Sequence, residues 1–185
     1  MIEKVRPYFY FGNLFIFVLK VVLFFWTKSY AFLISSFYNL CIGLAKREVH
    51  SKKNNYRLVG FFVMIASLCF VVYSIYVIIV HKVVAYNIYS GITIATVTFY
   101  DIGYSIYEIW KSIKNRNEQN NILNLVNLAT ALVSLELTQS ALLSFTQINV
   151  DNSLYNGLLG LLVSMCSFFI GGSICFRSNK KYNIK

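Results

Sequence analysis

The sequence predicts an all-α integral membrane protein, a bundle of six transmembrane helices arranged as three hairpins. Three observations predict it: the composition, six long apolar runs and the distribution of positive charge. Of the 185 residues, 57% are hydrophobic and 13% are charged, whereas soluble domains have about 25% charged residues. A water-soluble fold would therefore have too little polar surface.

The apolar runs define the expected helices, because about 20 apolar residues span the hydrocarbon core of a bilayer. Backbone groups in lipid must form hydrogen bonds within their own segment, so each run is expected to be helical. The second run is short and the fourth is long. We expect one domain, residues 1–185, with spans at residues 8–26, 30–45, 58–80, 84–110, 122–145 and 157–176.

The first run follows a basic start with Lys4 and Arg6, as in a signal peptide. No small-residue cleavage site follows it, so we expect the first helix to be retained. The four cysteines fall within or at the ends of apolar runs without a C-x-x-C pair, which predicts packing residues rather than disulfides.

Positive charge predicts the orientation. In the six-helix arrangement, fourteen of the 17 Lys and Arg residues fall on one side, which the positive-inside rule assigns to the cytoplasm together with both termini. Basic loops beside anionic lipid explain the net charge of +10 without nucleic acid. The expected location is the cell membrane. The expected partners are the lipid bilayer and either other membrane subunits or a second copy of the chain.

The hairpins show a weak internal similarity. Residues 20–22 and 82–84 are both Lys-Val-Val, and residues 86–87 and 155–156 are both Tyr-Asn. A chain rich in Val, Phe and Tyr also produces such matches by chance, so a repeat stays open at this point.

Ionisable residues inside the expected spans are the best pointers to function, because each is costly in lipid unless it is paired or hydrated. Asp101 lies about 15 Å from the inner boundary at Lys111, near the middle of the membrane. Lys20 and Glu136 share a depth of roughly 21–22 Å, so they can form a pair. Alternatively, Lys20 extends to the outer surface, and Asp101 and Glu136 are buried structural acids that are protonated or hydrogen-bonded. Glu108 precedes Lys111 by three residues, which predicts a surface ion pair.

Polar residues form stripes on the fourth and fifth expected helices. Asp101 belongs to a stripe that should face protein or water. The fifth helix has two polar sides, with Asn127 on one and Glu136 on the other, which predicts a central position. The fourth-helix stripe comprises Asn87, Ser90, Thr98, Asp101, Ser105 and Glu108.

Small residues recur at spacings of three and four along the sixth helix. Such a seam lets a neighbouring helix approach closely, and packing is a sufficient explanation for it. The seam comprises Gly157, Gly160, Ser164, Ser167 and Gly171.

Two hypotheses of different classes follow. The leading one is a small solute or ion carrier, or its membrane subunit, with a path between the fourth and fifth helices. The rival is a non-transporting interaction protein whose polar stripes only join helices. No enzyme, catalytic residue, cofactor or metal site is expected, because no nucleophile motif or His/Asp ligand pair occurs. The candidate ion- or substrate-binding residues are Asp101, Glu136, Lys20, Asn39 and Asn127.

The stretch Lys20–Asn39, KVVLFFWTKSYAFLISSFYN, resembles the first hairpin of cation diffusion facilitators, where a turn precedes a metal-binding helix. That resemblance implies carboxylate or histidine ligands one turn apart on the second and fifth helices. This chain offers Asn39 alone on the second and Glu136 alone on the fifth. The size and helix count are similar to those of the substrate-binding subunits of energy-coupling-factor transporters. Residues 8–26 lack the A-x-x-x-A motif of those subunits, and neither resemblance names a family.

Overall fold

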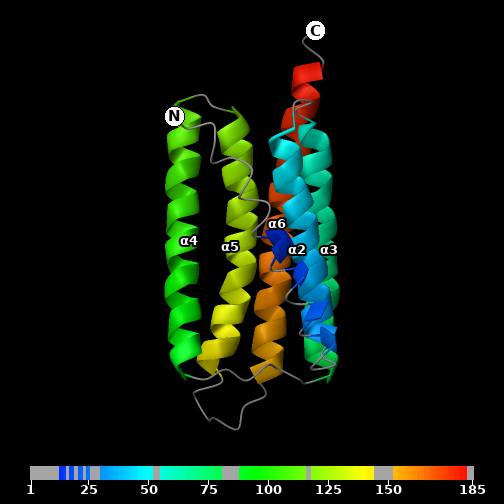
Figure 1. Cartoon of the computed structure of the whole chain (residues 1–185), viewed down its shortest axis with the longest axis vertical. Coiled ribbons are helices and arrows are strands. Elements are labelled where there is room, and N and C mark those ends of the chain that lie inside the picture. Colours follow the sequence, from blue (N-terminus) through cyan, green and yellow to red (C-terminus); the bar gives the residue numbers. More distant parts are fainter. Residues whose placement is uncertain are drawn as a thin grey trace. The chain divides into compact units, whose positions relative to one another are not determined.

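Every regular element that the structure describes is a helix, which confirms the all-α prediction for this part of the chain. The structure is a computed structural model (Figure 1). It describes residues 13–15, 17–18, 21–22, 24–25, 30–51, 55–80, 88–115, 118–143 and 152–182. The described residues between 13 and 25 are helical. The further helices are α2 (Tyr30–Val49), α3 (Tyr56–Val80), α4 (Ile88–Lys114), α5 (Glu118–Leu143) and α6 (Asn152–Tyr182).

Several helices extend past the apolar runs into charged sequence. Helix α2 continues to Val49 with Lys46 and Arg47 in its last turn, and α4 continues to Lys114. Helix α5 begins earlier than expected, at Glu118. Cations near a helix C-terminus and anions near an N-terminus interact favourably with the helix dipole. Hydropathy detects only the apolar part of such helices, so it misplaces these ends.

Two described helices are long and apolar enough to cross a membrane. They are Tyr56–Val80 of α3 and Ser153–Arg177 of α6, with mean hydropathies of 2.6 and 2.1. Only 39% and 33% of their most apolar windows are buried, unlike the core helices of soluble proteins. Apolar helices with mainly exposed surfaces favour association with lipid. The six-span arrangement stays a prediction.

The chain forms two compact units, and the first comprises residues 1–70 and 168–185. Within it, the rings of Tyr38 on α2 and Phe70 on α3 lie 5.8 Å apart between centroids. Helices α3 and α6 meet at Gly60 and Gly171. A Cβ atom added to Gly60 would lie 2.5 Å from the carbonyl oxygen of Gly171, and one added to Gly171 would lie 2.9 Å from that of Gly60.

The second unit comprises residues 71–167. Helices α4 and α5 run side by side in it (Figure 1). Asn124 of α5 donates a hydrogen bond of 3.4 Å from its amide to the hydroxyl of Ser112 on α4. On α6, a Cβ atom at Gly157 would lie 2.9 Å from the carbonyl oxygen of Ser74 on α3. The small-residue seam thus permits close helix approach in both units, as predicted.

Candidate functional site

A buried carboxyl group lies where three helices of the second unit meet. Glu136 of α5 is only 2% exposed. A Cβ atom added to Gly160 of α6 would lie 3.7 Å from Cγ of Glu136 and 3.1 Å from Cβ of Ser74 on α3. Helices α3, α5 and α6 therefore each place one residue at the same buried point.

Glycine at position 160 makes this convergence possible. An added Cβ would collide with the hydroxyl of Ser74, so no side chain fits between α6 and α3 without movement. One turn later, the buried hydroxyl of Ser164 donates a 2.5 Å hydrogen bond to the carbonyl oxygen of Gly160. A serine that bonds to its own helix can pack as a small residue without leaving a polar atom unsatisfied.

A second buried polar side chain lies one turn before Gly160 on α6. Asn156 is 1% exposed, and its spacing of four residues places it on the same helix face as Gly160. Neither polar atom of its amide group has a hydrogen-bond partner among the described residues. The side chain therefore has both a donor and an acceptor available for a bound polar group. Such a partner would offset the cost of burying an unpaired amide.

The side chains of Glu136, Ser74 and Asn156 have the chemistry to bind a proton or a small metal cation. A carboxyl group, a serine hydroxyl and an amide present oxygen atoms, which are suitable partners for a proton or a small cation. No cluster of three His, Cys, Asp or Glu side chains occurs in the described ranges. The chemistry offered by these residues includes reversible protonation and cation binding.

The remaining candidate residues lie on several elements, and the side chains of Asn39 and Asn127 are among the described ones. Asn39 is buried on α2 and belongs to the first unit. Asn127 is half-buried on α5, nine residues before Glu136, so the two side chains leave the helix on opposite sides. Asp101 is in α4, but its side chain lies outside the described part, as does all of Lys20. A pair between Lys20 and Glu136 therefore stays a prediction.

The expected surface ion pair on α4 is confirmed. Nζ of Lys111 lies 3.3 Å from Oε1 of Glu108, and this hydrogen bond raises the pKa of the lysine. Ser105, from the polar stripe, is buried within the second unit. The burial of Ser105 agrees with a polar stripe that faces protein, whereas Glu108 lies on the surface of the helix.

Ser74 and Asn156 were not among the candidates from the sequence. Ser67 and Ser74 are separated by seven residues and are both buried on α3, a small-residue period that resembles the seam of α6. Asn156 immediately precedes the first glycine of the seam. Both signals are present in the sequence, but an amide beside a small-residue seam does not reveal which helix it faces.

Comparisons with known proteins add no information on function, so a functional assignment rests on the residues described above. The chain matches no protein-family model, no curated protein and no solved structure.

Proposed function

We propose that this chain is a multi-pass membrane protein that carries a small solute or an ion, alone or as the membrane subunit of a larger transporter. It has six spans and cytoplasmic termini, and Glu136 is its proton- or cation-binding carboxylate. The proposal depends on one observation: Glu136 is buried beside Gly160, at the point where α6 also approaches Ser74 of α3.

The cost of this arrangement supports a functional role. An apolar residue would fill the same space between helices without desolvating a carboxylate. Ionisable groups at membrane depth are rare, face a protein interior or a hydrated cavity, and commonly mark ion or proton pathways. Asn156, one turn before Gly160 on α6, adds a second buried polar group, whose amide atoms have no hydrogen-bond partner among the described residues.

The proposed mechanism couples the charge of Glu136 to helix packing. In the bound state, a proton or cation neutralises the carboxylate, and α5 packs closely against α3 and α6. In the empty state, the carboxylate is charged and is more stable in contact with water than packed beside Gly160 and Ser74. Helices α3, α5 and α6 therefore separate on one side to admit water. Asp101 on α4 is the second proposed carboxylate. Substrate binding between α4 and α5 then depends on whether these two acids hold a proton or cation.

The first prediction concerns Glu136→Gln. The amide keeps the shape of the side chain, but it takes up no proton in the physiological range and lacks the negative charge that attracts a cation. We expect coupled flux in proteoliposomes to be abolished while expression and thermal stability are unchanged or improved, because a charge has been removed from the interior. The matched control is Glu108→Gln, which removes an acid from the surface of α4 and should retain flux.

Full flux in Glu136→Gln would contradict the assignment of this residue. An absence of flux in the wild-type protein across a panel of cations and small solutes would contradict transport itself. In that case the interaction protein becomes the better hypothesis.

One observation favours that rival. Large aromatic side chains cover the exposed surface of α4 at Tyr100, Tyr104, Tyr107 and Trp110, and the first two rings stack with centroids 6.0 Å apart. Tyrosine and tryptophan are enriched in protein interfaces. A non-transporting subunit would use this surface to bind another membrane protein. Crosslinking of Tyr104→Cys to one partner in intact membranes, together with absent flux, would support this function.

A further inference from the structure

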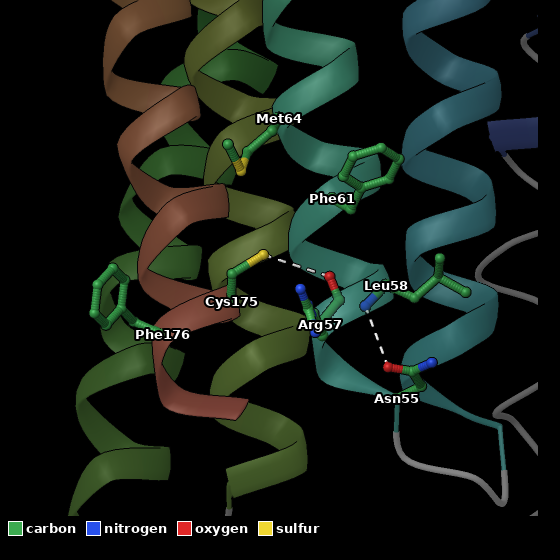
Figure 2. A pocket seen from close by; sticks show the side chains of 7 residues that line it. All are labelled: Asn55, Arg57, Leu58, Phe61, Met64, Cys175 and Phe176. Atoms are coloured by element: carbon green, nitrogen blue, oxygen red, sulfur yellow. Dashed lines mark hydrogen bonds between the residues drawn. The ribbon is translucent and has the colours of Figure 1, made fainter. Parts of the chain in front are cut away.

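An open groove in the first unit is separate from the Glu136 site. It lies between the start of α3 and the later part of α6, as Figure 2 shows. The thiol of Cys175 on α6 donates a 3.4 Å hydrogen bond to the carbonyl oxygen of Arg57 on α3, which joins the two walls. The lining residues are Asn55, Arg57, Leu58, Phe61, Met64, Cys175 and Phe176.

The groove changes from polar to apolar along its length. At one end, the side-chain oxygen of Asn55 accepts a 3.4 Å hydrogen bond from the backbone N–H of Leu58 and caps α3. Arg57 is exposed beside it. Phe61 and Met64 follow Arg57 by four and seven residues, so the three lie along one face of α3 over about 10 Å. Phe176 adds an exposed aromatic ring from α6.

The polar end coincides with the boundary of both membrane-crossing candidates. The apolar stretch of α3 begins at Tyr56, and that of α6 ends at Arg177. The arginine at the groove mouth is thus at the depth of lipid headgroups, whereas Phe61 and Met64 extend into the hydrocarbon. This placement requires only that α3 and α6 cross the membrane and does not depend on transport.

The charge at the mouth selects for an anion. Arg57 and the exposed Arg177 lie at this boundary, the N-terminus of α3 carries a partial positive charge, and no described residue of the lining is acidic. A guanidinium group binds a phosphate through two parallel hydrogen bonds. Free phosphate would leave the apolar wall unused, whereas a lipid fills both ends.

We propose that this groove binds one anionic phospholipid. Its phosphate contacts Arg57 at the mouth, and the first part of one acyl chain lies along Phe61, Met64 and Phe176. The lipid occupies the surface between α3 and α6 and thereby stabilises the first unit.

Titrations of the full-length protein in detergent micelles provide the test. Binding of phosphatidylglycerol, of phosphatidylcholine with the same acyl chains and of inorganic phosphate would each be measured by native mass spectrometry. We expect phosphatidylglycerol to bind best. Arg57→Gln should weaken it about tenfold, the loss expected for a hydrogen-bonded charge. The control is Arg47→Gln, an exposed arginine of α2 outside the groove, which should change the affinity less than about twofold.

A second pair of variants tests the acyl-chain wall. Phe61→Ala should weaken phosphatidylglycerol binding, whereas Phe169→Ala, which removes an exposed ring of α6 outside the groove, should not. The proposal is overturned if phosphatidylcholine or phosphate binds as well as phosphatidylglycerol. It is also overturned if Arg57→Gln and Arg47→Gln weaken binding equally, since diffuse attraction to a basic surface would then explain it, or if Phe61→Ala has no effect.

Discussion

At the scale of single residues, Gly171 and Gly172 are adjacent on α6 but have opposite surroundings. A Cβ atom at Gly171 would lie 2.9 Å from the carbonyl oxygen of Gly60 and 3.0 Å from the backbone nitrogen of Met64. Backbone atoms of α3 cannot move aside independently of their helix. At Gly172 nothing described lies within 4 Å of an added Cβ. The two positions therefore separate a steric effect from an effect of helix propensity.

We predict that Gly171→Ala destabilises the protein by about 1–3 kcal/mol, the usual cost of overpacking. Gly172→Ala should be neutral or stabilising by up to about 1 kcal/mol, because alanine favours a helix more than glycine does. Thermal unfolding of both variants in the same detergent provides the measurement. Equal tolerance of the two substitutions would mean that α3 and α6 do not meet at Gly60 and Gly171.

The seam shows what residue patterns can and cannot predict. The spacing of small residues from Gly157 to Gly171 predicted a close helix contact, because small side chains let two helix backbones approach each other. It could not predict Gly60 or Ser74 as the facing residues. The choice of partner helix depends on the packing of segments distant in sequence, which local spacing does not encode.

At the scale of helices, α5 packs on two sides. It contacts α4 through Asn124 and Ser112, and Glu136 faces Gly160 of α6. The two polar sides in its sequence predicted this central position within the second unit. A helix with both sides buried presents its polar residues to other helices, where they can form hydrogen bonds.

The link between α4 and α5 is open to a double-mutant test. Ser112→Ala removes the acceptor of the buried Asn124 amide and should cost about 1–3 kcal/mol. Combining it with Asn124→Leu should cost less than the sum of the single variants, because no unpaired amide remains. Ser173→Ala is the control, since that exposed hydroxyl bonds to the carbonyl oxygen of Ile170 on its own helix. Additive costs in chemical unfolding would show that the two side chains do not interact.

At the scale of the whole molecule, apolar runs predict helices more directly than they predict membrane spans. Long apolar runs correctly predicted the helices α2 to α6 that the structure describes, because a helix satisfies its own backbone wherever it lies. Spans require sufficient hydropathy, and among the described helices only α3 and α6 reach it. Helix α4 contains Asp101, Glu108 and many tyrosines. Whether such a helix crosses lipid depends on its neighbours as well as on its composition.

Cysteine labelling tests the six-span arrangement. In a background without the four native cysteines, Ser51→Cys and Lys180→Cys should react with an impermeant reagent only from the cytoplasmic side. The substitutions Lys28→Cys, Lys82→Cys and Asn152→Cys should react only from outside, because they lie at the opposite ends of the predicted hairpins. Labelling of Ser51→Cys from outside would reject both the orientation and the count of six.

The contact between Gly60 and Gly171 also has a consequence for biosynthesis. Helix α3 leaves the ribosome on the order of 100 residues before the end of α6, a delay of roughly 5–20 s at ordinary rates of translation. During this interval the face of α3 around Gly60 has no permanent neighbour. Because Gly60 has no side chain, other helices can approach the backbone of α3 at this position before α6 does. Helix α6 then has to replace any such neighbour before its backbone meets Gly60.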